Sequence, residues 1–181
     1  CTMLKNDNSH PYVLDASSGC WRRPDYASID YSDGNETEDN IAALVRSCQD
    51  RSVLSDELRA LCTDWPTTYH LSGTRANILR PFESALPGSR VLEIGAGCGA
   101  ITRFLGESGA QVLALEGSLR RAGIARARTS ELDNVTVLAE SFSQFEAPGQ
   151  FDCITLIGVL EYANLFVEGE HPTLRMLQKA A

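Results

Sequence analysis

Short apolar runs alternate with amphipathic stretches in the second half of the chain. The apolar runs, each short enough for one buried strand, are residues 90–94, 111–115, 135–138 and 151–157. Helical periodicity fills residues 100–107 and 118–129 between them. Because near-continuous apolar strands separated by helices are typical of a parallel sheet covered on both faces, the pattern predicts an α/β fold. Right-handed crossovers then make it a doubly wound, Rossmann-like parallel sheet with four visible strands.

The first half of the chain has a different rhythm. Residues 31–35 predict a turn, because Asp-Gly supplies a positive φ at low cost. Apolar residues recur at three- and four-residue steps over 41–48, which indicates an amphipathic helix. Ser55 and Ser72 are the expected N-caps of two further helices. We expect Trp65-Pro66 to break the first of these, so this half should be mainly helical.

The charge balance excludes one class of partner. The 181 residues carry 16 Lys and Arg against 24 Asp and Glu, a net charge of −8, and a nucleic-acid surface needs clustered cations. The four arginines within 120–128 fall at helical spacing, and we expect them on a solvated helix face. No apolar run approaches the ~20 residues of a membrane helix. We therefore expect neither nucleic acid as a partner nor a membrane span.

The six cysteines are spaced neither for zinc nor for an evident disulfide framework. No two form a C-x-x-C pair, and no histidine lies near them at zinc-finger spacing, so we expect no metal site. Cys98 and Cys153 fall in a loop and a strand that the apolar pattern predicts to be buried. Free cysteines are typical of reducing compartments, and a cytoplasmic location is the expectation.

A glycine cluster follows the first apolar run. Residues 93–99 read Glu-Ile-Gly-Ala-Gly-Cys-Gly, between a predicted strand and a predicted helix. Glycine lets the backbone turn sharply and lets a ligand lie against bare main chain, beside the free N–H groups at the start of a helix. About twenty residues on, the second strand ends at Glu116, where a carboxylate can accept hydrogen bonds from the hydroxyls of a ribose. This order of elements favours a nucleotide-type ligand over a glycine turn without one.

Two kinds of cofactor fit this order. Gly95, Gly97 and Ala100 satisfy the dinucleotide pattern G-x-G-x-x-A. Glu93 argues against a dinucleotide, because its charge would face a pyrophosphate, whereas it suits a cofactor with an ammonium group and a sulfonium. Gly99 adds a third glycine in alternation. The loop favours the sulfonium cofactor, with a NAD(P)-dependent oxidoreductase or a non-catalytic module with a vestigial pocket as the alternatives.

Residues 91–99 resemble motif I of the class I S-adenosylmethionine-dependent methyltransferases. Residues 113–116 resemble the acidic strand that follows in that family, and residues 151–162 resemble its fourth strand. Four segments of the first half resemble a bacterial subgroup often found with O-antigen and other glycan biosynthesis; these are 31–34, 65–66, 69–72 and 75–81. The resemblance implies a seven-stranded fold, of which the first four strands are visible, and S-adenosylmethionine as the cofactor.

The resemblance also assigns residues to the cofactor. They are Tyr69, Arg75, Glu93, Gly95, Ala96, Gly97, Gly99, Glu116, Ser141, Phe142, Ile157 and Gly158. The glycines would line the methionine and ribose, while Glu93 would hold the amino group and Glu116 the ribose hydroxyls. Where the family often has an Asp for the adenine amino group, this chain has Glu140-Ser141, and Phe142 would stack on the adenine.

The remaining assignments concern the methionine end and the acceptor. Ile157 and Gly158 would close the methionine end, while Tyr69 and Arg75 would fold over it, with the planar fork of Arg75 pairing the carboxylate. His70 is a candidate general base, and a purely structural histidine is the alternative. The expected function is methyl transfer to a small-molecule or sugar (glycan) acceptor, at an oxygen whose proton needs a base.

The two zones imply two domains. Residues 1–87 would form the N-terminal helical extension, and residues 88–181 the S-adenosylmethionine-binding domain. Residues 174–181 resemble the middle of a helix that leads to a fifth strand in the family. We therefore expect the sequence to stop before this domain is complete, and this part alone to bind the cofactor weakly.

Overall fold

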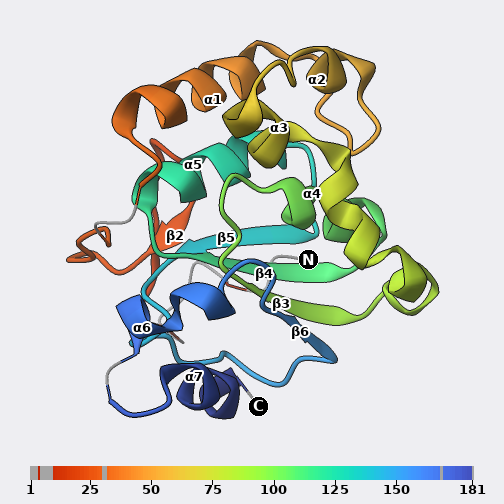
Figure 1. Ribbon diagram of the computed structural model, residues 1–181. Coiled ribbons are helices and arrows are strands. Elements are labelled where there is room, and N and C mark those ends of the chain that lie inside the picture. Colours follow the sequence, from red (N-terminus) through yellow and green to blue (C-terminus); the bar gives the residue numbers. More distant parts are fainter. Residues whose placement is uncertain (1–3, 5–9, 30–31, 168, 181) are drawn as a thin grey trace.

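A computed structural model describes residues 4, 10–29, 32–167 and 169–180. These residues form one six-stranded mixed sheet in the order β1-β2-β5-β4-β3-β6 (Figure 1). The strands are β1 (Val13–Leu14), β2 (Trp21–Arg22), β3 (Arg90–Ile94), β4 (Gln111–Glu116), β5 (Val135–Ala139) and β6 (Cys153–Thr155). The helices are α1 (Asn35–Ser47), α2 (Asp56–Ala60), α3 (Trp65–Leu71), η1 (Gly73–Ile78), η2 (Arg80–Ala85), α4 (Ala100–Glu107), α5 (Leu119–Arg128), η3 (Leu160–Tyr162), α6 (Ala163–Phe166) and α7 (Pro172–Ala180).

Strands β3 to β6 form the parallel centre of the sheet, which confirms the predicted doubly wound α/β fold. Arg90 to Ile94 of β3 pair in register with Gln111 to Leu115 of β4, and β6 pairs with the other edge of β3. Strand β5 pairs with β4 on the far side. All four strands run the same way, so their carboxyl ends meet at one edge, where ligands bind in such sheets.

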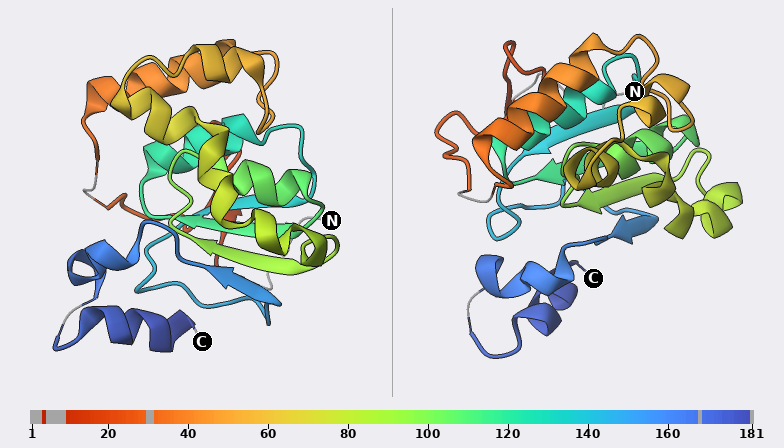
Figure 2. Two further views of the ribbon diagram at one scale, coloured as in Figure 1. Left: turned by 45° about the vertical axis from the view of Figure 1, so that its right-hand side comes forward. Right: turned by 45° about the horizontal axis from the view of Figure 1, so that its top comes forward.

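Each face of the sheet has its own core, because alternate side chains of a strand point to opposite faces. Val112 and Val137 pack with Phe104 of α4 on one face. Leu113 packs with Met176 of α7 on the other. Figure 2 shows α1 to α3 lying over α4 and α5, on the side opposite to α6 and α7. The first-half helices are therefore a second layer above one face of the sheet.

Helices α1 to α3 are joined to the layer of α4 and α5 by apolar contacts and by buried arginines. Ile41 and Val45 of α1 pack with Ile124 of α5. Arg128 is fully buried and donates to the main-chain carbonyls of His70 (2.6 Å) and Leu71 (2.8 Å). These carbonyls end α3 and have no partner within the helix. The prediction that the arginines of 120–128 form a solvated face is therefore wrong for Arg128, and also for the buried Arg121.

The N-terminal residues contribute strands as well as helices. Strands β1 and β2 form a short antiparallel pair, and β2 then pairs in parallel with β5, Trp21 opposite Leu138 and Arg22 opposite Ala139. Two-residue strands leave no alternating pattern in the sequence, and the expected extension was mainly helical for this reason. Residues 13–22 thus share a sheet with residues 90–155, and the division into domains at residue 87 stays a prediction.

The first-half helices differ from the expected ones at two places. Trp65-Pro66 begins α3 instead of breaking a helix, because Asp64 caps the Thr67 N–H (2.9 Å) and proline is tolerated in a first turn. Ser72 caps a 3-10 helix, η1, and accepts from the Thr74 N–H at 3.2 Å. Of the predicted turn, Tyr31 lies outside the described residues.

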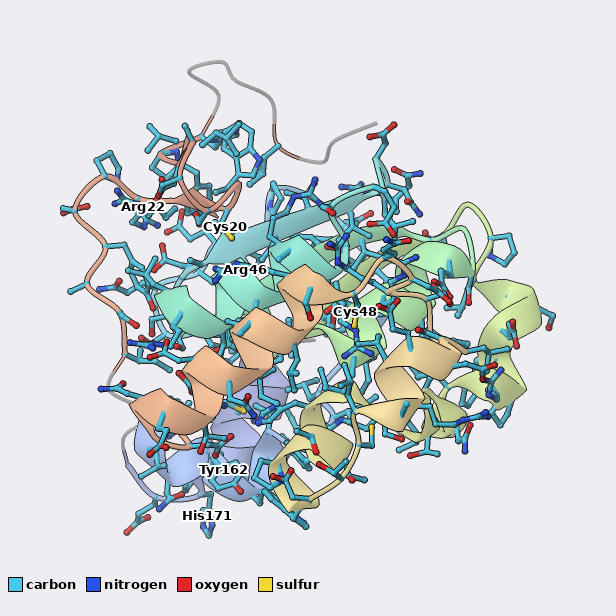
Figure 3. The ribbon with its side chains drawn as sticks, turned by 90° about the horizontal axis from the view of Figure 1, so that it is seen from above. Cys20, Arg22, Arg46, Cys48, Tyr162 and His171 are labelled. Carbon is cyan, nitrogen blue, oxygen red and sulfur yellow. The ribbon has the colours of Figure 1, made fainter. Side chains whose placement is uncertain are left out.

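Two further observations concern the chain as a whole. Cysteines 20, 48, 62, 98 and 153 are all free, whereas Cys1 lies outside the described residues. Cys20 and Cys48 come from separate segments, as a view from above shows (Figure 3). No helix in the described part of the chain is long and apolar enough to cross a membrane.

Candidate active site

A cavity of about 250 Å³ lies at the carboxyl edge of the parallel strands. The loops after β3, β4, β5 and β6 form its floor, and α3 and η1 supply its upper wall. Apart from Gly99, all the residues assigned to the cofactor line this cavity, and so does His70. Side chains from both halves of the sequence are therefore brought to one place, as the resemblance implied, although their contacts with a cofactor stay predictions.

Gly95 and Gly97 of the loop after β3 have different surroundings. Gly95 and Gly97 have φ of 78° and 56°, in the left-handed region that favours glycine. A Cβ on Gly95 would lie 2.4 Å from Cγ2 of Val159, so the loop after β6 packs directly on it. A Cβ on Gly97 would meet no atom within 4 Å, because it would point into open space. Gly97 therefore leaves room for a ligand against its main chain.

Gly99 lies outside the cavity wall, unlike its predicted role. Its φ is 81°, and a Cβ there would lie 2.8 Å from Cα of Ala125 in α5. The N-terminus of α4 thus packs against the backbone of α5, a contact that only glycine permits. The structural reason for glycine at this position is helix packing.

Glu116 holds the glycine loop in place. Its Oε2 accepts from the Gly97 N–H at 2.7 Å and its Oε1 from the Ser118 N–H at 2.9 Å. Burial raises the pKa of the Glu116 carboxyl, and these two hydrogen bonds oppose the shift. Each carboxylate oxygen has a further lone pair, so the side chain can brace the loop and still accept from hydroxyls in the cavity.

The other end of the cavity holds a carboxylate and a guanidinium. Glu93 is 4% exposed, and its Oε2 has no hydrogen-bond partner among the described residues. Burial raises the pKa of this carboxyl to about 7. The guanidinium of Arg75 lies over the Tyr69 ring, 4.0 Å from its centroid, and a Cβ on Gly158 would be 3.5 Å from Nη2 of Arg75. An acidic and a basic residue thus line the same cavity.

The segment before α1 closes the end of the cavity beyond β5. Glu140 is fully buried, and its Oε2 pairs with Nε of Arg23 at 2.5 Å, while its Oε1 accepts from the Ser141 N–H. Ile29 covers Gly117, where a Cβ would lie 2.4 Å from Cδ1 of Ile29. Glu140 therefore anchors residues 23–29, and the neighbouring Ser141 and Phe142 line the cavity.

Asp33 and Trp65 are among the residues of the cavity wall that the sequence did not indicate as site residues. Asp33 accepts from Nε2 of His70 at 2.8 Å, and it also pairs with Arg121 at 2.7 Å. Trp65 is 69% exposed, and its ring stacks on Tyr69 with centroids 5.0 Å apart. The motifs that contain them drew attention to this region, but no spacing indicated that Asp33 and His70 would meet.

Comparisons with known proteins bear on this geometry. Residues 92–181 match a family model described as a methyltransferase domain. The ubiquinone biosynthesis O-methyltransferase of Xanthomonas campestris pv. campestris (strain B100) is 35% identical over 81 residues, which are 43% of this chain and 34% of the relative. The fold is that of an S-adenosylmethionine-dependent methyltransferase. The chain spans about a third of the length of the curated relatives it matches.

Solved structures share this methyltransferase fold. EvdMO1 is 27% identical with a TM-score of 0.50, and the match covers 61% of this chain and 26% of that one. The N-methyltransferase NodS from Bradyrhizobium japonicum WM9, solved with S-adenosylhomocysteine, is 22% identical with a TM-score of 0.53. That match covers 79% of this chain and 65% of NodS. It includes much of the region before the methyltransferase domain match, because residues 92–181 alone are about half of the chain.

Proposed function

We propose that this chain binds S-adenosylmethionine in the cavity and transfers its methyl group to an oxygen atom of a small-molecule acceptor. The observation that carries the proposal is that an acidic residue, Glu93, and a basic residue, Arg75, line the same cavity. An ammonium group bound beside Glu93 would favour the ionised form of its carboxyl group, and the Arg75 guanidinium complements a carboxylate. Together they match the amino-acid end of the cofactor, whereas the pyrophosphate of NAD would bring negative charge toward Glu93.

The rest of the cavity suits the nucleoside. Gly97 has open space where a side chain would be, and the neighbouring Glu116 has lone pairs for ribose hydroxyls. Phe142 offers a ring and Ser141 a hydroxyl at the end that residues 23–29 close. Glu140 is fully buried and paired with Arg23, whereas Ser141 is partly exposed and its hydroxyl shares a hydrogen bond with Ser143; we propose Ser141 as the substitute for the acidic residue that the family often places there.

Positioning is the main contribution of the chain to the reaction. S-adenosylmethionine, when bound, supplies an electrophilic methyl group on a sulfonium. The side chains then need only align the acceptor oxygen behind this methyl carbon and exclude water. Tyr69 and Arg75 cover the cavity from above, opposite Gly158, and so provide the cover that excludes water.

The oxygen and the class of acceptor are proposed on separate grounds. Transfer to oxygen is supported by the named O-methyltransferase relatives. A sugar or glycan acceptor is supported by the resemblance of residues 65–66 and 69–72 to the glycan-associated subgroup. Trp65 adds a physical reason, because the negative face of an exposed indole attracts the partly positive C–H groups of a sugar ring. A cytoplasmic site of action also stays a prediction.

Calorimetric titration tests the cofactor. S-adenosylhomocysteine and NAD are titrated separately into the protein, with Glu93→Gln and Glu116→Ala as variants. We expect binding of S-adenosylhomocysteine alone, weakened in both variants. Binding of NAD alone would contradict the proposal and favour an oxidoreductase. Absence of binding by both ligands would favour a vestigial pocket.

Transfer of a radiolabelled methyl group tests the acceptor. A panel of mono- and oligosaccharides and a panel of catechols are incubated with the protein and labelled S-adenosylmethionine. Label in the sugars supports the glycan acceptor. Label confined to the catechols contradicts it and leaves O-methylation standing.

A further inference from the structure

Two segments that were singled out in the sequence meet at the cavity through one hydrogen bond. Asp33 comes from the turn just before α1, and His70 comes from the last turn of α3. Nε2 of His70 lies 2.8 Å from Oδ2 of Asp33. His70 is buried, with 4% of its surface exposed, and it lines the cavity. The cofactor contacts proposed above leave this pair unused.

The hydrogen bond selects the tautomer of His70. A carboxylate can only accept, so Nε2 carries the proton and Nδ1 keeps a lone pair. Among the described residues nothing is bonded to Nδ1, and Nδ1 is not one of the fully buried unpaired atoms. Nδ1 therefore keeps some accessible surface, and His70 lines the cavity. An imidazole in this state can take one proton from a neighbouring hydroxyl.

The surroundings of His70 favour its neutral ring, which can accept a proton. Burial lowers the pKa of His70, which the hydrogen bond to Asp33 opposes, while Arg121 of α5 and Arg75 of η1 lower it further. The Tyr69 ring lies perpendicular to the His70 ring, with their centroids 5.0 Å apart. A neutral imidazole at pH 7 is thus available as a base.

The ion pairs behind Asp33 hold the carboxylate in place. Oδ2 of Asp33 pairs with Arg121 at 2.7 Å, and Arg121 also pairs with Glu38 of α1 at 2.8 Å. Arg120 bridges Glu38 and Asp39. The Asp33 carboxylate at Nε2 favours an imidazolium once a proton arrives, while the guanidiniums of Arg121 and Arg75 oppose it.

We propose that Nδ1 of His70 is the general base that removes the acceptor's hydroxyl proton, and that Asp33 positions the ring for this step. As the acceptor oxygen bonds to the methyl carbon, the bond from that carbon to sulfur breaks and its electron pair stays on sulfur. The hydroxyl proton moves to Nδ1, and the resulting imidazolium later releases it to water. The inference rests on the proposed function, because it presumes a cofactor methyl group beside His70.

Titration of His70 by nitrogen-15 NMR tests the base without needing a known acceptor. Spectra are recorded over a pH series with S-adenosylhomocysteine and with S-adenosylmethionine, and the His70→Gln variant identifies the signals. The two ligands differ by one methyl group and one positive charge on sulfur. If Nδ1 faces the methyl group, the sulfonium lowers the His70 pKa by about one to two pH units relative to the neutral thioether. The signal of the exposed His171 should be the same in both complexes.

Each outcome decides one part of the proposal. A lower His70 pKa in the S-adenosylmethionine complex, with the proton on Nε2 at neutral pH, supports His70 as the base. Equal His70 titration in both complexes places the ring away from the methyl group and overturns the base, while binding of both ligands leaves the cofactor proposal intact. A proton on Nδ1 at neutral pH also overturns it. If neither ligand binds in calorimetry, the proposed function itself fails and the base fails with it.

Matched variants test the positioning role of Asp33. Asp33→Asn should populate both tautomers, because an amide can donate to Nε2 as well as accept from it. Asp39→Asn removes a carboxylate from the same cluster without touching His70, and it should leave the tautomer unchanged. If Asp33→Asn also leaves the tautomer unchanged, Asp33 does not position the ring.

Discussion

Gly97 and Gly99 are two residues apart in one loop, yet the structure predicts opposite consequences for replacing them with alanine. Both have a left-handed backbone, with φ of 56° and 81°. A Cβ on Gly97 would enter the cavity and touch no atom of the described chain, whereas a Cβ on Gly99 would collide with Ala125. Gly97→Ala should therefore damage ligand binding, and Gly99→Ala should damage the fold.

The magnitudes follow from two separate costs. Placing a Cβ on a left-handed residue costs about 1–2 kcal/mol, and both variants pay it. Gly99→Ala adds overpacking, because the new Cβ would lie 2.8 Å from a backbone atom and 3.1 Å from Cβ of Ala125. Overpacking of this kind costs about 1–3 kcal/mol. We expect a loss of about 1–2 kcal/mol for Gly97→Ala and about 2–5 kcal/mol for Gly99→Ala.

Urea denaturation and calorimetry with S-adenosylhomocysteine measure the two effects. Gly88→Ala is the control for backbone strain alone, since Gly88 has a φ of 77°, has open space around its missing Cβ and lies outside the cavity. Gly88→Ala should lose stability as Gly97→Ala does but keep full affinity for the ligand. The reasoning is refuted if Gly99→Ala is as stable as Gly88→Ala, or if Gly97→Ala binds as tightly as the unaltered chain.

Three further predictions follow from other parts of the site. The pKa of Glu93 is about 7 in the folded chain and 4.5 in the unfolded chain. The free energy of unfolding should therefore fall by about 3 kcal/mol as pH rises between these values. Glu93→Gln should remove this pH dependence in denaturation experiments while weakening S-adenosylhomocysteine binding. Arg23→Gln should cost about 2 kcal/mol because it leaves the buried Glu140 without its ion-pair partner. The neighbouring Arg22→Gln breaks a surface pair with Asp15 and should cost less; equal losses would contradict this. Trp65→Ala should leave the melting temperature and the cofactor affinity nearly unchanged but raise KM for a sugar acceptor up to about tenfold, and an unchanged KM would remove the indole from the acceptor site.

The parallel strands could be predicted because most of their residues are buried and apolar. Residues 90–94 were placed at their full extent, and the second and third strands within one residue at their ends. The fourth was predicted too long. At its start, the Asp152 carboxylate accepts from the Arg90 N–H at 2.7 Å, and the Asp152 N–H donates to the Arg90 carbonyl at 2.8 Å. Regular pairing is confined to 153–155.

The residues of the site also divide into those that could be predicted from the sequence and those that could not. Residues that follow directly after strands could be placed from the topology, since parallel strands bring their carboxyl ends together. Asp33 and Arg23 could not, because their partners are distant in sequence and leave no periodic signal. The prediction was wrong for Arg128 because a charged residue at helical spacing normally faces water, whereas here the last carbonyls of α3 replace water as the acceptors.

The pairing of β2 with β5 has a consequence for the order in which the molecule folds. Arg23 and Glu140 are 117 residues apart in sequence, so the contact closes a loop that spans most of the chain. Contacts of such high sequence separation are slow to form, and β2 needs the finished edge of β5 to pair with. The segment 21–29 should therefore dock last and leave first. A nucleoside held beneath it would slow unfolding while leaving the folding rate unchanged, because the transition state lacks this contact.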